Sequence, residues 1–180
     1  MKYVILRFLD WLLRHLQWYR EQQLNKELMA NIGSCGKNVY IRGMSKFIDP
    51  SKLNIGNNVW IGENAWFRCD GEITIGNNVI ISRRCSIFSA NHQYEGETLP
   101  YDESFRYRPV VIEDNVWIGM NVSIAAGVTI GEGAIISMGS VVTKDVDPLS
   151  IVGGTGVRVI NKRDREHYEN LKMANKFLIR

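Results

Sequence analysis

The chain has 180 residues, enough for one domain with a buried core. Hydrophobic residues make up 45% of it and charged residues 23%, which is typical of a globular protein and argues against a disordered chain. The formal net charge of +3 is mild, so we expect no nucleic-acid partner. Three scattered cysteines show neither metal-ligand spacing nor a CxxC pair, which favours a reduced, cytoplasmic protein.

Residues 1–31 are predicted to form an amphipathic N-terminal helix. Its apolar arc is wide and includes Trp11 and Trp18, more than a small docking helix needs. Charged residues interrupt the segment every few positions, so we expect neither a signal peptide nor a membrane span. The helix either packs on a neighbouring subunit or lies at a membrane surface, which would place the protein peripherally at the inner face of the membrane. One side of it carries Leu6, Leu9, Leu13 and Leu16.

A six-residue period runs through residues 32–160 and decides the predicted fold. A helix would give a period of 3.6 residues and a half-buried strand a period of two. Six fits a coil of short strands and tight bends, in which three strands close a triangle of about 18 residues and coils stack at about 4.8 Å. The period therefore predicts a parallel β-solenoid, in which each coil buries its apolar side chains against its neighbours. The repeating positions, with a slip of two residues after the third, are Ile55, Ile61, Phe67, Ile75, Ile81 and Ile87, and then Ile112, Ile118, Ile124, Ile130, Ile136 and Val142.

The period breaks at residues 91–109, which form a polar, aromatic and turn-rich insertion. A long insertion in an otherwise rigid solenoid is usually functional. His92, the only histidine within the repeat region, lies where the insertion begins. The sequence therefore indicates that this insertion contains a candidate functional site.

The C-terminal segment, residues 161–180, follows a short predicted strand that begins after Val157. We expect a helix from about Lys162 to Leu178, because apolar residues recur there at helical spacing. Its docking face would be Tyr168, Leu171 and Met173 or Ala174.

Several motifs resemble those of the hexapeptide-repeat acyltransferases. They are IGNNV at 55–59, WIG at 117–119, AGVTIG at 126–131 and GSVVTKD at 139–145. Within that family the chain is most similar to the galactoside, maltose and capsular-polysaccharide O-acetyltransferases, over about residues 32–160. The resemblance implies a left-handed parallel β-helix and a homotrimer with active sites between subunits. It also implies acetyl-coenzyme A as co-substrate, no metal, and a hydroxyl of a sugar or glycan precursor as acceptor.

The resemblance also assigns candidate site residues. His92 falls where these enzymes place their catalytic histidine, and would act as the general base that takes the proton of the attacking hydroxyl. On the acceptor side, Asp70 matches an asparagine that contacts the acceptor, although a carboxylate there could also orient the imidazole, and Tyr94 is a candidate by its place in the insertion. The coenzyme would contact Trp117, Met120, Met138, Gly139, Thr143, Lys144, Arg158 and Asn161. Three of these depart from the family pattern, since methionine replaces the usual serine at 120 and alanine at 138, and asparagine replaces an arginine at 161.

Other interpretations remain open on the sequence alone. The acceptor could be an amine, as in amino-sugar or antibiotic-inactivating (xenobiotic) acetyltransferases of the same architecture. A carbonic anhydrase of the same fold would need three protein ligands for its zinc, and His15 and His167 lie outside the coils, so we expect no metal. A β-helix used only as a scaffold would not bind coenzyme A.

Overall fold

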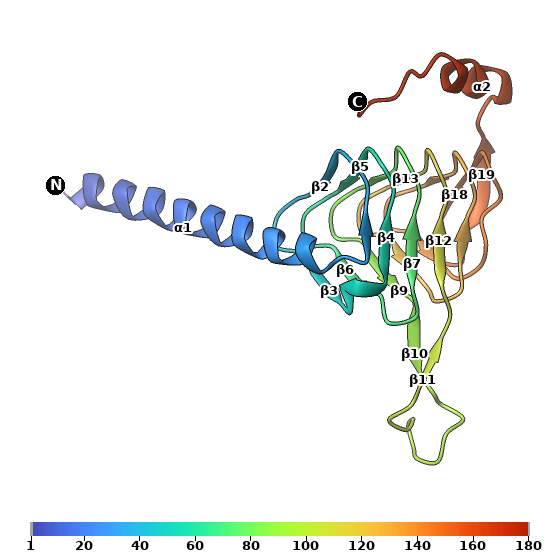
Figure 1. Cartoon of the computed structure of the whole chain (residues 1–180), viewed down its shortest axis with the longest axis horizontal. Coiled ribbons are helices and arrows are strands. Elements are labelled where there is room, and N and C mark those ends of the chain that lie inside the picture. The colour runs from blue at the N-terminus through green and yellow to red at the C-terminus, as the bar shows by residue number, and fades with distance from the viewer. Residues whose placement is uncertain (1, 180) are drawn as a thin grey trace.

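A computed structural model describes residues 2–179, apart from the side chain of Lys2. The chain forms a β-solenoid with a long helix at its N-terminal end and a short helix at its C-terminal end (Figure 1). The predicted fold class, a left-handed parallel β-helix with N-terminal and C-terminal helices, is confirmed.

Three sheets form the walls of the solenoid. Sheet A contains β1 (Ser34–Cys35), β4 (Leu53–Ile55), β7 (Ile73–Ile75), β12 (Val110–Ile112) and β15 (Thr129–Ile130). Sheet B contains β2 (Val39–Ile41), β5 (Val59–Ile61), β8 (Ile80–Ile81), β13 (Trp117–Ile118), β16 (Ile135–Ile136), β18 (Ser150–Gly153) and the antiparallel β19 (Arg158–Lys162). Sheet C contains β3 (Lys46–Ile48), β6 (Trp66–Arg68), β9 (Ser86–Phe88), β14 (Ser123–Ile124) and β17 (Val141–Val142), and a 3₁₀ turn, η1 (Pro50–Lys52), follows β3.

The six-residue period sets both the core and the register between coils. Ile75, Ile112 and Ile130 are successive Cα partners in sheet A, and all three are almost fully buried. The same holds in sheet B for Ile81 and Ile118. Each coil thus covers the apolar side chains of the next, and this stacked column is the hydrophobic core.

The slip of two residues in the period has a local cause. Leu53 pairs with Ile73, whereas Ile112 pairs with Ile130. The coil that begins at Leu53 is therefore two residues longer than the coil that begins at Ile112. The additional residues lie in a turn closed by the hydrogen bond from the Glu72 N–H to the Cys69 carbonyl. The longer turn keeps the strands in register while displacing the sequence period.

Asparagines form a ladder at the corner between sheets A and B. Asn38, Asn58, Asn78 and Asn115 all have positive φ, between 55° and 61°, a conformation that asparagine tolerates better than most residues. Each side-chain amide donates to the next one along the stack, at 3.0, 3.0 and 3.1 Å. The ladder therefore satisfies the polar groups of this corner and fixes the bend in successive coils.

Helix α2 (Arg165–Met173) is shorter at both ends than the sequence predicted. The chain stays extended in β19 through Lys162, and the Asp164 side chain then caps the helix by accepting from the His167 N–H at 2.6 Å. Of the expected docking residues, Tyr168 is buried, whereas Met173 is 72% exposed and does not dock. The N-cap, rather than the apolar spacing, decides where the helix begins.

Glu132 ties α2 to the solenoid. It accepts hydrogen bonds from the Tyr168 hydroxyl at 2.7 Å and from the Lys172 ammonium group. Burial disfavours the ionised carboxylate, but these hydrogen bonds outweigh it and lower the pKa of Glu132. The Tyr168 hydroxyl also accepts from Asn115 at 2.8 Å, so α2 caps the end of the asparagine ladder.

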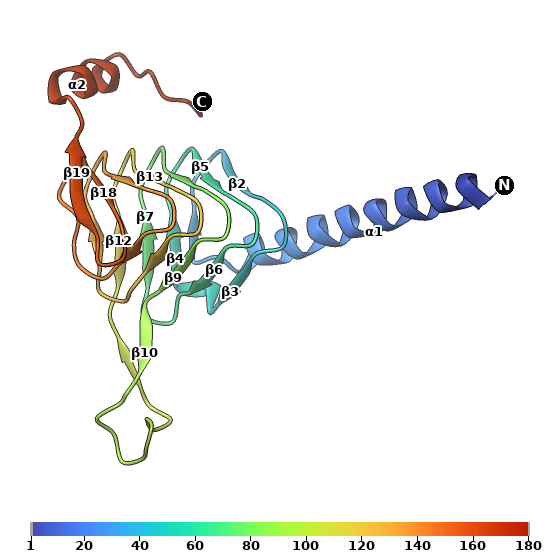
Figure 2. The same cartoon turned by 180° about the vertical axis from the view of Figure 1, so that it is seen from behind.

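Helix α1 (Lys2–Asn31) extends well beyond the body of the solenoid, as the two opposite views show (Figures 1 and 2). It is attached near its C-terminal end, where the Asn25 amide donates to the Ile41 carbonyl at 3.0 Å and Leu28 and Met29 pack against the core. Within residues 2–179 no helix combines the length and hydropathy that crossing a bilayer requires.

Candidate active site

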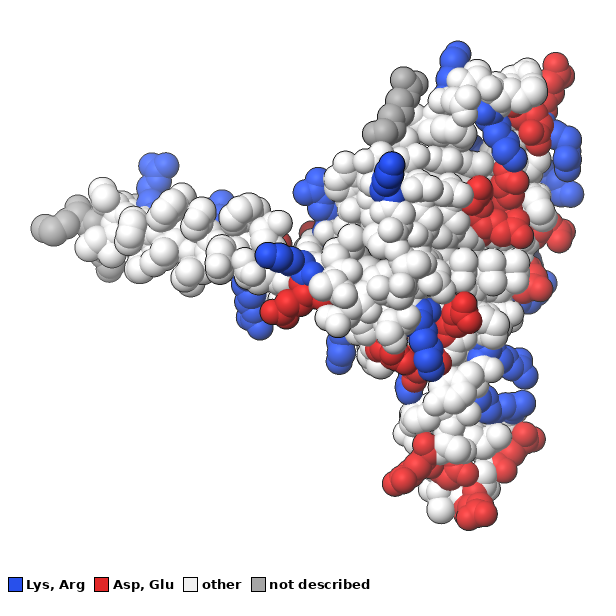
Figure 3. Space-filling view, viewed as in Figure 1, with Lys and Arg blue, Asp and Glu red and all other residues white. Residues whose placement is uncertain are grey.

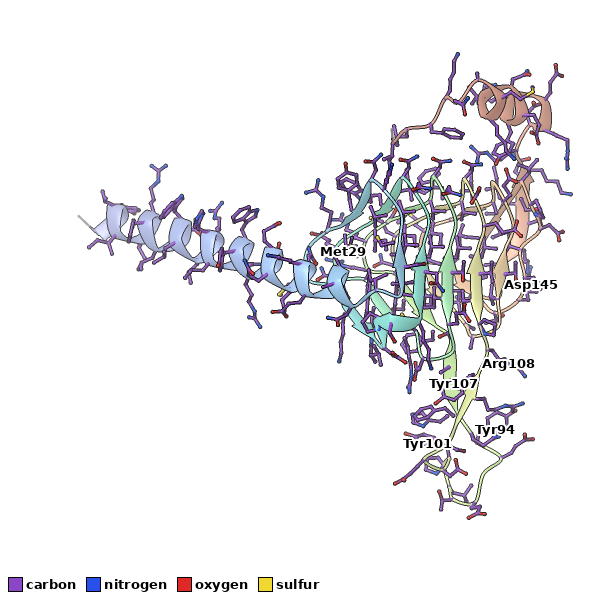
Figure 4. The ribbon with its side chains drawn as sticks, in the orientation of Figure 1. Met29, Tyr94, Tyr101, Tyr107, Arg108 and Asp145 are labelled. Atoms are coloured by element: carbon purple, nitrogen blue, oxygen red, sulfur yellow. The ribbon has the colours of Figure 1, made fainter. Side chains whose placement is uncertain are left out.

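The insertion at 91–109 contains a β-hairpin that projects from the corner between sheets C and A (Figure 1). Its strands are β10 (Ala90–His92) and β11 (Phe105–Tyr107), paired antiparallel with His92 opposite Phe105 and Asn91 opposite Arg106. Because side chains alternate across a strand, the hairpin has two distinct faces. Figure 4 shows Tyr101 and Tyr107 on one side of it and Tyr94 and Arg108 on the other.

The imidazole of His92 lies between two aromatic rings. The Tyr101 ring is nearly parallel to it, with centroids 3.9 Å apart and an interplanar angle of 20°. The Phe105 ring lies 4.5 Å away at 41°. The Nδ1 atom is buried and has no hydrogen-bond partner among the residues described. The ring is thus held by packing, and its orientation depends on the two aromatic residues.

An ion pair between Arg68 and Asp70 packs against this aromatic stack. The guanidinium of Arg68, at the end of β6, lies 4.3 Å from the centroid of the Phe105 ring. Its Nε donates to the two carboxylate oxygens of Asp70 at 3.1 and 3.0 Å, and Nη2 lies 3.0 Å from Oδ2. Both side chains are largely buried, at 19% and 17% exposure. The structure therefore connects Asp70 to His92 through Arg68 and Phe105, and within residues 2–179 no hydrogen bond joins the two directly.

A cavity of about 180 Å³ borders His92. Arg106 lies over the Tyr94 ring at 5.4 Å and pairs with Glu95 at 3.5 Å. The cavity walls thus offer aromatic surface, amide and guanidinium groups, which suit a polar, hydroxylated ligand. The cavity is lined by Asn91, His92, Tyr94, Arg106, Arg108, Ala125 and Ala126.

The candidate coenzyme residues fall into three places on the solenoid. Trp117 is half exposed on the outer face of β13, and Met120, Met138 and Gly139 follow in the turns between sheets B and C. Thr143 and Lys144 lie in a turn between sheets C and A, the same corner from which the hairpin projects. Arg158 and Asn161 lie on the exposed β19.

Within one chain, sheet C separates His92 from some of the candidate coenzyme residues. His92 extends from the corner between sheets C and A, whereas Trp117, Met120 and Met138 lie at or before the corner between sheets B and C. A single chain therefore does not bring the imidazole together with these three residues. Thr143 and Lys144 share the corner of the hairpin, two coils further along the solenoid.

Three residues of the His92 environment were not found from the sequence: Arg68, Tyr101 and Phe105. Arg68 stands two positions before Asp70, which is compatible with an ion pair but does not indicate one. The stacking of Tyr101 and Phe105 on the imidazole depends on the hairpin register, and no repeat runs through residues 91–109 to predict it. The only signal available was the aromatic content of the insertion.

The buried cysteines are poorly suited to form a covalent acetyl intermediate. Cys69 and Cys85 are completely buried in the core. Burial raises the pKa of Cys69 to about 12 and also raises the pKa of Cys85. Because the thiolate is the nucleophilic form, neither side chain is activated. Within residues 2–179, no group of three or more histidine, cysteine, aspartate or glutamate side chains is placed to hold a metal ion.

Comparisons with known proteins agree with this architecture. Residues 109–144 match the family described as bacterial transferase hexapeptide (six repeats). The galactoside O-acetyltransferase of Escherichia coli (strain K12) is 34% identical over 152 residues, which cover 83% of this chain and 73% of that protein. A 2,3,4,5-tetrahydropyridine-2,6-dicarboxylate N-acetyltransferase of Thermotoga sp. (strain RQ2) is 56% identical, but over only 68 residues, 38% of this chain and 29% of that one.

The solved structures give the same result. A hexapeptide-repeat-containing acetyltransferase from Vibrio cholerae O1 biovar eltor, complexed with acetyl-coenzyme A, superimposes with a TM-score of 0.71. The two proteins are 30% identical, and the match covers 80% of this chain and 79% of that one. The repeat, the coil and these relatives agree, and the chain belongs to the hexapeptide-repeat acetyltransferase family.

Proposed function

We propose that the protein transfers an acetyl group from acetyl-coenzyme A to a hydroxyl of a sugar or cell-surface glycan precursor, with His92 as general base. The observation that carries this proposal is the imidazole of His92, held between two rings at the edge of a polar cavity. The similarity over most of the chain to a galactoside O-acetyltransferase supports a hydroxyl acceptor. We place the reaction in the cytoplasm, where acetyl-coenzyme A is available.

The proposed reaction needs no covalent intermediate. The acceptor hydroxyl attacks the thioester carbonyl, and His92 takes its proton as the carbon–oxygen bond forms. The tetrahedral intermediate then collapses, the carbon–sulfur bond breaks, and the imidazolium returns the proton to the departing thiolate. Because Nδ1 of His92 is buried, we assign both proton transfers to Nε2. The products are the acetyl ester and free coenzyme A.

We further propose that the active enzyme is a homotrimer with its sites between subunits. Sheet C separates His92 from Trp117, Met120 and Met138 within one chain, so a neighbouring subunit is needed to bring the two sets together. In this arrangement Trp117 and the two methionines would line the path of the pantetheine arm. The remaining candidates would bind the rest of the coenzyme, with Lys144 and Arg158 near its phosphates and Gly139, Thr143 and Asn161 as polar contacts.

An N-acetyltransferase is the second candidate, because the Thermotoga relative acts on nitrogen, although it covers only 38% of this chain. Purified protein should be incubated with acetyl-coenzyme A and a panel of galactosides, maltose, amino sugars and aminoglycoside antibiotics while free thiol is measured. We expect thiol release with hydroxylated sugars and a product that hydroxylamine cleaves, since esters are labile to it and amides are not. Release only with amines, giving a stable product, would establish N-acetylation instead. Failure of coenzyme A to bind in calorimetry would favour a scaffold.

The aromatic stack suggests how Asp70 acts. We infer that Asp70 holds Arg68 against Phe105, and that this packing fixes the imidazole of His92. Arg68 and Asp70 are then positioning residues, and both carboxylate oxygens of Asp70 contact Arg68. This interpretation differs from a direct contact between Asp70 and the sugar, and the two make different kinetic predictions.

Replacing Arg68 with leucine is expected to lower kcat roughly tenfold, because a small displacement of a catalytic group is costly. The KM for acetyl-coenzyme A should stay unchanged, Asp70→Asn should behave like Arg68→Leu, and Arg68→Lys should recover part of the rate. Arg165→Leu, at the exposed start of α2, is the matched control and should leave kcat unchanged. A rise in acceptor KM in Asp70→Asn at constant kcat would instead show that Asp70 binds the acceptor.

A further inference from the structure

The first two thirds of helix α1 expose an unusually wide apolar surface. With 3.6 residues per turn, its large apolar side chains other than Tyr3, which lies within the polar stripe, cover about 240° of the helix circumference. The remaining polar stripe is narrow and consists of Arg7, Asp10, Arg14, Gln17 and Glu21. The exposed apolar residues, each between 46% and 84% accessible, are Tyr3, Val4, Ile5, Leu6, Phe8, Leu9, Trp11, Leu13, Leu16, Trp18 and Tyr19.

The body of the protein does not cover this surface. Helix α1 contacts the solenoid near its C-terminal end, through residues such as Asn25 and Met29. Figure 3 shows the helix as a largely uncharged rod that extends from the solenoid into solvent. On one side of it the rings of Phe8, Trp11, His15 and Trp18 stack on one another, with centroids 5.3–6.0 Å apart. An exposed apolar surface of this extent indicates a binding partner.

The composition of the helix indicates what that partner is. Residues 2–20 contain four basic residues and one acidic residue, Asp10, which pairs with Arg14. An excess of basic residues is attracted to an anionic surface. Tryptophan and tyrosine are enriched where membrane and water meet, and Trp11, Trp18, Tyr3 and Tyr19 are all exposed here.

The width of the apolar arc argues against a second copy of the helix as the partner. A coiled-coil seam uses two positions in seven and covers one narrow stripe of each helix. If the leucine side, Leu6, Leu9, Leu13 and Leu16, packed in such a seam, the aromatic side with Trp11 and Trp18 would remain in water. A lipid interface can surround the whole arc while the polar stripe faces the solvent.

We propose that residues 3–19 of α1 form a docking surface for an anionic lipid membrane, with the helix lying in the interface. The stripe with Arg7, Asp10 and Arg14 faces water, and the leucine and aromatic sides enter the lipid. The inference does not depend on the acetyl acceptor. It would place the enzyme at a surface where a lipid-linked glycan precursor could be reached.

The full-length protein should be sedimented with vesicles of phosphatidylcholine alone and of phosphatidylcholine with 30% phosphatidylglycerol, against a blank without vesicles. We expect stronger binding to the anionic vesicles, and weaker binding as salt rises. The double variant Trp11→Gln with Leu13→Gln should lower partitioning at least tenfold. The matched control Gln17→Ser with Glu21→Asp, on the polar stripe and with the net charge unchanged, should bind as well as the unaltered protein.

Two results would overturn the proposal. One is equal partitioning of the unaltered protein and the Trp11→Gln/Leu13→Gln variant. The other is a lower oligomeric mass of that variant in light scattering, without any vesicle binding by the unaltered protein, which would show that the helix docks on a second copy. A melting curve and the rate of coenzyme A release establish that the variant is folded, since both substitutions lie outside the solenoid.

Discussion

Replacing His92 with alanine is expected to lower the turnover number by about 10²- to 10⁴-fold, the usual contribution of a general base. The acceptor hydroxyl would then have to attack with its proton in place, and the departing thiolate would lose its proton donor. Acetyl-coenzyme A should still bind, because the candidate coenzyme residues lie on the solenoid and β19 and not on the hairpin. Turnover should therefore fall much more than coenzyme affinity.

This experiment should use the acceptor that gives the fastest thiol release, with calorimetry for coenzyme A and a melting curve for each variant. His167→Ala is the matched control, since it removes an exposed imidazole from α2 and should keep the full rate. A rate near that of the unaltered protein in His92→Ala would remove His92 from the mechanism. Loss of coenzyme binding in the same variant would show that the hairpin helps to form the coenzyme site.

The fold was predictable because the solenoid repeats the same physical requirement at every strand. Each strand of the coil buries an apolar side chain at an equivalent position, so the period of six is present in the sequence itself, as at Ile112, Ile118 and Ile124. The slip before Ile75 came from a longer turn and did not conceal the pattern. Helix α2 was less predictable, because the side chain of Asp164, and not apolar spacing, sets its start.

For the candidate site, the sequence predicted individual residues but not how they are arranged. The resemblance named His92, but the pairing of Arg68 with Asp70 and the position of Phe105 over the guanidinium depend on how the hairpin returns to the solenoid. A hairpin outside the repeat has no periodic signal to set its register. The roles assigned to the candidate residues therefore stay predictions, which the kinetics of the variants at His92, Arg68 and Asp70 test.

Replacing Phe67 with alanine is expected to lower the free energy of unfolding by about 3–5 kcal/mol. Phe67 is completely buried, and its ring stacks on Phe47 with centroids 4.7 Å apart and an interplanar angle of 7°. Its Cα partners are Phe47 in the preceding coil and Ile87 in the next coil. Truncation would leave a cavity between three coils. The backbone of each coil is hydrogen-bonded to its neighbours in the parallel sheets, so the coils cannot move closer together to fill this cavity.

Urea unfolding followed by circular dichroism would measure the loss, with Phe47→Ala as the matched control. Phe47 makes the other half of the same ring pair, but it lies in the first coil and is only partly buried, so its truncation should cost roughly half as much or less. Equal losses for the two variants would mean that the first coil is packed as tightly as the interior of the solenoid. Phe67 also precedes Arg68, so a loss of turnover in Phe67→Ala larger than the fraction unfolded would show that the core of this coil supports the stack against His92.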